Sequence, residues 1–178
     1  MKKIKSQTKK ECKSLKKDGI IENKKRGVKM KKVFIVILLF FLNILYINAE
    51  DYQDIILRKV NNFRVESGLK PLKLNKELNK IAIVKAKDMA KEEKLSHNSK
   101  KFGMTFNLIK EKGIRYSVAA ENIARWHDTP EFVADRWIES KGHRGNILNP
   151  AYDETGIGLA QDKNGKNYWV QLFIKRKK

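Results

Sequence analysis

One histidine, His143, lies between two glycines, Gly142 and Gly145, in the run W-I-E-S-K-G-H-R-G-N-I-L-N-P that extends from Trp137 to Pro150. A neutral imidazole can ligate a metal ion or transfer protons near neutral pH. The glycines allow close approach of the backbone or a positive φ angle. The run is therefore a candidate site for metal or proton chemistry, although glycine-flanked histidines also occur at helix ends.

Two other segments carry polar residues of the same kind. Residues 86 to 99, A-K-D-M-A-K-E-E-K-L-S-H-N-S, end a predicted helix on His97, and residues 119 to 124, A-A-E-N-I-A, carry Glu121. A G-I-G strand and a final aromatic strand follow. In order and spacing these segments resemble the CAP superfamily of cysteine-rich secretory proteins, antigen 5 and plant pathogenesis-related proteins, in its disulfide-free bacterial form. The resemblance runs from Ile55 to the C-terminus.

The resemblance implies a shared polar site. The family gathers two histidines and two glutamates in a large central cleft, and some members hold a divalent metal there. On this chain it assigns His97, Glu121 and His143 to the cleft. At the fourth position, where eukaryotic members have glutamate, this chain has Ser140. The neighbouring Glu139 would point about 100° away around a helix, so three of the four groups are expected.

Two imidazoles and one carboxylate form a chemically sensible zinc set, because a catalytic zinc site leaves its fourth position to water. Such a water becomes a nucleophile when its pKa falls towards ~7. No second carboxylate is positioned as a general base, so we assign no catalytic residue. We expect a secreted binding module that takes a lipid, glycan or peptide and can hold zinc or another divalent metal. A metal-assisted hydrolase or protease using His97, Glu121 and His143 is the alternative.

Each candidate also has a purely structural interpretation. His97 can stabilise a helix end, where the dipole favours a cation, and Glu121 can be a buried carboxylate that accepts backbone hydrogen bonds. We expect structural positions for the other polar and aromatic residues nearby: Arg144 and Asn146 bonding the loop backbone, Trp137 and Trp169 packed in the core, and His127 in a solvated loop.

The formal charge of +20 does not indicate a nucleic-acid partner. Residues 1 to 49 hold 14 of the 40 basic residues, and residues 50 to 178 carry a net charge of +9 that is scattered along the chain. Basic residues interleaved with aromatic ones are absent from the sequence.

The expected partner is an unknown small hydrophobic or envelope ligand. The basic run at residues 175 to 178 predicts a solvated tail that can contact an anionic membrane surface, and the oligomeric state stays open.

The N-terminal region has the order of a secretory signal peptide. A basic stretch begins at Met30, an apolar run extends from Val33 to Ile47, and a small residue, Ala49, marks the expected cleavage site. The apolar run is short for a membrane span, which needs ~20 residues. We therefore predict a basic extension at 1–29, a signal peptide at 30–49, and an exported domain at 50–178. The extension is either a disordered tail or a start assigned upstream of Met30.

The exported region alternates helical and strand patterns. Helices are predicted at 51–67, from Asn75 onward, between Gly103 and Gly113, and after Thr129. In the last of these, Phe132, Val133 and Trp137 form the expected buried face. Tyr116 to Ala124 fits a strand, and residues 156–159 and 168–174 form a hairpin around Asn164-Gly165. The only cysteine is Cys12, so this region has no disulfide framework. The pattern and the resemblance together predict an α+β fold, a three-layer α-β-α sandwich with a small, mainly antiparallel central sheet.

Overall fold

The structure, a computed structural model, describes residue 35 and residues 51–177. The predicted extension at 1–29 and the predicted signal peptide at 30–49 lie outside the described residues, apart from Ile35. Residues 51–178 form a compact unit. Within the described residues, no helix is both long enough and apolar enough to cross a bilayer.

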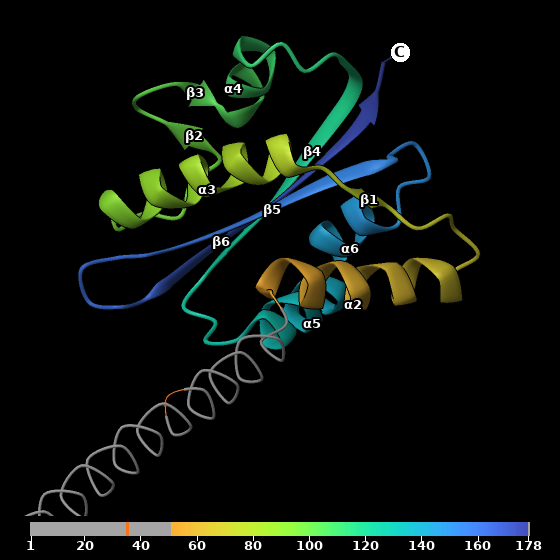
Figure 1. Cartoon of the computed structure of the whole chain (residues 1–178), viewed down its shortest axis with the longest axis horizontal. Helices are drawn as coiled ribbons and strands as arrows, with labels where there is room; N and C mark the ends of the chain where they lie inside the picture. Colours follow the sequence, from red (N-terminus) through yellow and green to blue (C-terminus); the bar gives the residue numbers. More distant parts are fainter. Residues whose placement is uncertain (1–34, 36–50, 178) are drawn as a thin grey trace, which may run out of the picture. The chain divides into compact units, whose positions relative to one another are not determined.

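A four-stranded sheet forms the middle layer of this unit (Figure 1). Its order is β1 (Lys73–Leu74), β5 (Glu154–Gln161), β6 (Asn167–Arg176) and β4 (Tyr116–Arg125). Only the short β1–β5 pairing is parallel. A separate antiparallel pair joins β2 (Asn98–Ser99) to β3 (Gly103–Met104).

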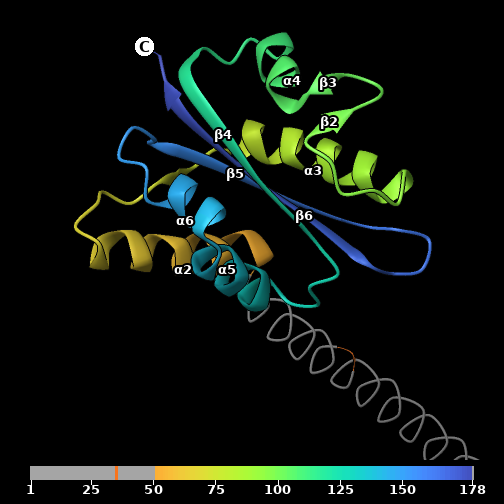
Figure 2. The same ribbon diagram turned by 180° about the vertical axis from the view of Figure 1, so that it is seen from behind.

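Helices cover both faces of the sheet, as the two opposite views show (Figures 1 and 2). One face packs against α3 (Lys76–Lys91) and α4 (Thr105–Glu111). The other face packs against α2 (Tyr52–Glu66), α5 (Pro130–Glu139) and α6 (Lys141–Ile147). The predicted α-β-α sandwich is confirmed.

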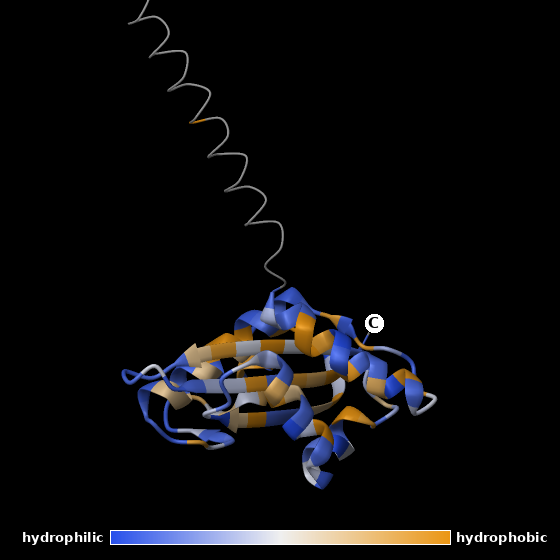
Figure 3. Ribbon diagram, turned by 90° about the horizontal axis from the view of Figure 1, so that it is seen from below, coloured by the Kyte–Doolittle hydropathy of each residue, from blue (hydrophilic) through white to orange (hydrophobic). Residues whose placement is uncertain are grey.

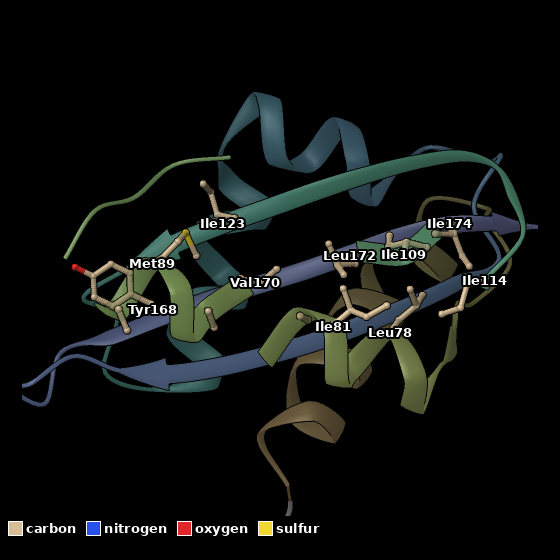
Figure 4. Close-up of a cluster of buried hydrophobic side chains, with 13 residues drawn as sticks. Leu78, Ile81, Met89, Ile109, Ile114, Ile123, Tyr168, Val170, Leu172 and Ile174 are labelled. Carbon is tan, nitrogen blue, oxygen red and sulfur yellow. The ribbon is translucent and has the colours of Figure 1, made fainter. Parts of the chain in front are cut away.

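Strand β6 explains why there are two hydrophobic clusters. Every residue from Asn167 to Ile174 is buried, and successive side chains of a strand point to opposite faces. Tyr168, Val170 and Leu172 join the cluster under α3 (Figure 4), whereas Trp169 and Phe173 join the cluster under α2 and α5. Along the strands, hydrophobic residues alternate with less hydrophobic ones (Figure 3).

Two glycines let α3 lie directly on β5. A Cβ atom at Gly158 would lie 2.2 Å from the backbone carbon of Ala82, and one at Gly156 would lie 2.3 Å from the Cβ of Leu78. Real Cβ atoms essentially never approach other atoms that closely. The G-I-G segment therefore sets the distance between helix and sheet.

Local capping signals predicted the helix starts correctly. Asn75 accepts hydrogen bonds from the first-turn amides of α3, and Thr129 accepts one from the amide of Phe132 at the start of α5. Gly68 follows α2 with a φ angle of +76°. Phe132 was expected on the buried face of α5, but its side chain is 48% exposed; only Val133 and Trp137 of the predicted trio are buried.

A buried arginine joins the ends of distant elements. Arg64 of α2 is 1% exposed, and its guanidinium donates to the carbonyls of Lys70, Ile147 and Asn149 at 2.9, 2.5 and 3.1 Å. These bonds satisfy carbonyl groups at the end of α6 and in the turn after it. Arg64 therefore fixes α6 against α2.

Amide side chains bond the part of β5 that extends past the end of β1. Beyond its short pairing with β1, the amide of Ile157 donates to Oδ1 of Asn79 at 2.8 Å, and the carbonyl of Ile157 accepts from Nε2 of Gln53 at 3.0 Å. The same two side chains bond each other at 2.7 Å. Helices α2 and α3 thus satisfy the backbone groups at this position of the strand.

The basic run at the C-terminus is exposed over residues 175–177, as expected, but its first two residues belong to a strand. Strand β6 extends to Arg176. Lys175 pairs with Asp153 at 2.9 Å, and Arg176 lies 3.6 Å from Glu154. Two of the four basic residues therefore have acidic partners, and contact with an anionic membrane surface stays a prediction.

Candidate polar site at the edge of the sheet

Strand β4 forms one edge of the sheet and directs neighbouring side chains to opposite faces. Ile123 belongs to the cluster under α3 and Ala124 to the cluster under α5. By the same alternation, Glu121 points to the α3 side and Asn122 to the α6 side. A site at this edge therefore draws side chains from both helical layers.

The carboxylate of Glu121 is nearly buried, with 3% of its side chain exposed. Oε1 lies 2.7 Å from Nδ1 of His97, and Oε2 accepts a hydrogen bond of 2.5 Å from the hydroxyl of Thr105. An ionised carboxylate can only accept hydrogen bonds, so Nδ1 of His97 carries the proton. In the neutral imidazole, the other ring nitrogen, Nε2, has a free lone pair, and 53% of the His97 side chain is exposed.

His97 does not end a helix. Helix α3 ends at Lys91, and the chain turns through Glu93, whose φ angle is +48°, before it reaches His97. The carbonyl of His97 accepts a hydrogen bond from Nζ of Lys85 at 3.1 Å. The interpretation of His97 as a helix cap is therefore wrong, because the histidine lies six residues beyond the helix.

Lys85 is a site residue that the sequence analysis missed. Its side chain is fully buried, and Nζ lies 5.7 Å from the ring centroid of Phe102. Burial lowers the pKa of Lys85, and the negative charges of Glu121 and Asp88 oppose that shift. A signal did exist: Lys85 falls on the buried stripe of α3, next to Ala86, where an apolar residue is the ordinary choice.

Thr105 was missed as well. It is the first residue of α4 and is buried, with 1% exposed. A threonine at a helix start has a common structural explanation, so its type and position did not distinguish it from an ordinary cap.

His143 lies in a short helix and not in a glycine turn. Gly142 and Gly145 are both inside α6, and neither is among the residues with positive φ in the described part of the chain. Burial, and secondarily the charge of a protonated His97, lower the pKa of His143. The imidazole of His143 is therefore neutral at neutral pH and lies within electrostatic range of His97.

Amide side chains fasten α6 to the edge of β4. Asn146 donates from Nδ2 to Oδ1 of Asn122 at 2.8 Å and to the carbonyl of Glu121 at 3.4 Å. Asn122 donates in turn to the carbonyl of His143 at 3.3 Å. Arg144 donates to the last carbonyls of α5, at Ile138 and Glu139. Arg144 and Asn146 are therefore structural, as predicted, but they bond the end of α5 and strand β4, whereas bonds to the loop backbone were expected.

The fourth position of the expected set holds no carboxylate. Ser140 lies in the link between α5 and α6, and its carbonyl accepts from the amide of Arg144 at 2.8 Å. Glu139 is 58% exposed and pairs with Arg136 of its own helix. Glu139 therefore does not take the place of the missing glutamate.

The remaining aromatic and histidine predictions have mixed outcomes. Trp137 and Trp169 are core residues, 0% and 1% exposed, as expected. His127 was expected to be a solvated loop residue, but burial lowers its pKa, and its carbonyl accepts a hydrogen bond from Nε1 of Trp169 at 2.8 Å. His127 thus belongs to a fixed turn.

The structure does not group the three expected residues as a set of metal ligands. In the described part of the chain, no three His, Cys, Asp or Glu side chains are grouped so that they could hold a metal ion. Both oxygens of Glu121 are engaged, by His97 and Thr105. Glu121 therefore lies behind His97 as its hydrogen-bond partner, which differs from the expected direct ligand. Metal binding itself stays a prediction.

Comparison with known proteins agrees with this architecture. The family model CAP, "Cysteine-rich secretory protein family", matches residues 57–173. The Bacillus subtilis protein YkwD is 38% identical over 123 residues, which are 69% of this chain and 47% of that protein. This chain thus spans less than half the length of that relative.

Solved structures give the same result. An extracellular protein of Bacillus anthracis that contains an SCP domain superposes with a TM-score of 0.65 at 28% identity, over 71% of this chain and 40% of that one. An outer surface protein of Borrelia burgdorferi has the same fold, with a TM-score of 0.63 at 22% identity over 69% and 91% of the two chains. The chain belongs to the CAP family of cysteine-rich secretory proteins, in a form whose CAP domain lacks cysteine.

Proposed function

We propose that this CAP domain is an exported binding module that holds its ligand at the edge of β4, between His97 and His143. Export is supported by the predicted signal peptide at 30–49 and by the extracellular location named for the Bacillus anthracis relative. The ligand class is that of a small lipid, glycan or peptide from the cell envelope. The proposal concerns the CAP domain only.

The observation that carries the proposal is the chain of hydrogen bonds from Thr105 through Glu121 to His97. A buried carboxylate that accepts the Nδ1 proton fixes the tautomer and orientation of an imidazole and makes its other nitrogen more basic. The Nε2 atom of His97 is therefore prepared to bind a metal ion or to accept a proton from a ligand.

A divalent metal would be held through two nitrogens, those of His97 and His143. Zinc commonly binds neutral imidazole, and the low pKa of His143 keeps that ring neutral. Other positions on the metal would go to water or to an oxygen of the ligand. Glu121 would contribute by orienting His97, without itself binding the metal.

Binding is favoured over hydrolysis because a hydrolytic water needs a base. Glu121 is already occupied by two donors, Ser140 replaces the second carboxylate, and Glu139 is paired on the exposed side of α5. Buried Lys85 donates to a backbone carbonyl. The described residues at this site therefore offer ligands and orientation, and no free carboxylate.

The test is a calorimetric titration of residues 50–178 with zinc. We expect binding to be lost in His97→Ala and in His143→Ala, and to be retained in His127→Ala, which removes the remaining histidine of the chain. Glu121→Gln should weaken binding by about 10- to 100-fold, as is typical when a partner behind a histidine ligand is changed.

Two results would contradict the proposal. If the folded wild-type domain binds no zinc, the metal part fails, and envelope lipids and glycans must be tested directly for binding that depends on His97. If the zinc-loaded domain turns over a peptide substrate, and His97→Ala abolishes that turnover, the hydrolase is correct and the binding module is not.

A further inference from the structure

A cavity lies at the end of β4 near Trp126, where the β5–β6 hairpin turns. Its volume is about 550 Å³. It is lined by six residues from three parts of the chain: Glu93, Trp126, Asp162, Asn164, Lys166 and Tyr168. None of these residues belongs to the polar site around His97.

Trp126 is the exposed aromatic residue of this cavity. It is 55% exposed, whereas Trp137 and Trp169 are buried in the core. The guanidinium of Arg125 lies 4.0 Å from the centroid of the Trp126 ring, and a cation in that position holds an indole in place. The ring is therefore oriented while much of its surface stays accessible.

The backbone at this cavity is strained. In the described part of the chain, the non-glycine residues with positive φ are Glu93, at +48°, and Trp126, at +67°, and both line the cavity. A bulky residue in this region of φ is a true outlier. Such strain persists only where the surroundings enforce it, and it clusters at binding sites.

The surroundings of Trp126 do enforce its conformation. Its amide donates to the carbonyl of Asn167 at 2.7 Å. The Asn167 side chain donates to the carbonyls of His127 and Asp128 at 3.0 and 3.2 Å, and Trp169 donates to that of His127. The sheet thus holds the segment after β4 so that the indole lies at the cavity before any ligand arrives.

The cavity also has an unused polar group. Tyr168 is fully buried and lines the cavity, and its hydroxyl has no hydrogen-bond partner among the described residues. In Figure 4 this hydroxyl points away from the other labelled side chains of the cluster. A buried hydroxyl without a partner is unfavourable, so a ligand oxygen that reached it would gain a hydrogen bond.

The remaining lining residues are polar and of both signs. Asp162 accepts from the amides of Asn164 and Lys166 through one oxygen, which fixes the turn. Glu93 is bridged to Lys163 at 2.8 Å. The cavity therefore combines one flat aromatic surface with several hydrogen-bonding groups.

From this combination we infer that the cavity binds the pyranose ring of a neutral glycan. A sugar ring has an apolar face that can lie on an indole and hydroxyl groups that can bond Tyr168 and the turn. A purely apolar ligand would leave the Tyr168 hydroxyl without a partner. The lining carries both acidic and basic side chains, Glu93, Asp162 and Lys166, so it favours a neutral ligand over one with a net charge.

The test is a fluorescence titration of residues 50–178, because Trp126 is the exposed tryptophan. The probes are soluble tetrasaccharides of β-1,4-linked N-acetylglucosamine, β-1,4-linked glucose and α-1,4-linked glucose. We expect a saturable change in emission with at least one of them. Trp126→Asn should abolish binding without unfolding the domain, because asparagine tolerates positive φ. Tyr168→Phe should weaken binding about tenfold, the effect of one lost hydrogen bond.

Phe132→Ala is the matched control. Phe132 is also an exposed aromatic residue, 48% exposed, with the guanidinium of Arg136 5.5 Å from its ring centroid, but it does not line the cavity. Its removal should leave sugar binding unchanged.

The inference is overturned if no tetrasaccharide changes the emission of the folded wild-type domain. It is also overturned if Trp126→Asn binds sugar as the wild type does. The proposed zinc binding at His97 is tested separately and does not depend on any of these outcomes.

Discussion

Replacement of Gly158 by alanine should destabilise the domain strongly, although it adds a single methyl group. The new Cβ would lie 2.2 Å from the carbon and 2.5 Å from the oxygen of Ala82, and 2.3 Å from the nitrogen of Ile83. All three are backbone atoms of α3, so no side-chain rotation relieves the contact. The helix must move away from β5, and the cluster beneath it, which includes Leu78 and Val170, must loosen.

The expected cost follows from two opposing effects. Overpacking of a core costs about 1–3 kcal/mol and occasionally more, and a clash with backbone belongs at the upper end of that range. Loss of glycine flexibility from the unfolded chain returns about 0.4–1 kcal/mol. We therefore expect the free energy of unfolding to fall by about 2 kcal/mol or more in Gly158→Ala. Urea denaturation, followed by tryptophan emission and circular dichroism, measures it.

Gly145→Ala is the matched control. Gly145 lies inside α6 with φ outside the positive region, and a Cβ there would meet nothing within 4 Å. Alanine in a helix is more favourable than glycine by about 0.5–1 kcal/mol, so this variant should be more stable than the wild type. If Gly158→Ala were as stable as the wild type, the close approach of α3 to β5 would not constrain the fold, and the reasoning would fail.

Three further predictions concern polar side chains. Arg64→Met should lower the free energy of unfolding by about 3 kcal/mol, because it leaves buried carbonyls without a donor; an unchanged urea midpoint would refute this. Because burial lowers the pKa of His143, the unfolded state binds more protons, so stability should fall as the pH drops below about 6.5. His143→Asn should reduce this slope, and equal slopes would contradict the assignment. Thr105→Val should cost about 1–3 kcal/mol by removing a donor from Glu121, and Thr105→Ser should restore most of it.

Several helix starts and the β5–β6 turn could be predicted because short sequence signals determine the backbone there. Asn75 and Thr129 cap their helices through side-chain oxygens, and the Asn164-Gly165 turn joins β5 and β6 with Gly165 at a φ angle of +75°. In these places the chemistry of one or two residues decides the backbone conformation.

Other parts depended on contacts that local sequence does not reveal. Helix α6 contains two glycines and forms because Arg144 bonds the end of α5 and Ile147 is buried in the core, so tertiary contacts override weak helix propensity. Phe132 has the spacing of a buried residue but contacts His127 at the surface, with ring centroids 5.1 Å apart.

For the candidate site, the residue types were predictable and their mutual arrangement was not. The motif indicated His97, Glu121 and His143 as neighbours. Sequence could not reveal that Glu121 contacts Nδ1 of His97, because that depends on where the chain turns after α3. The same turn brings buried Lys85 to the carbonyl of His97, a contact between residues that the helical pattern alone places far apart.

The amide side chains that close the sheet have a consequence for solubility. An open strand edge is a template on which another chain can pair and aggregate. Asn79 and Gln53 occupy the backbone groups of Ile157 on β5, and Asn146 occupies a carbonyl on β4. These contacts to the strand edges are hydrogen bonds and not disulfides, so they persist in both oxidising and reducing buffers. The domain should therefore stay monodisperse in reducing buffer, where disulfide-dependent secreted domains lose their structure.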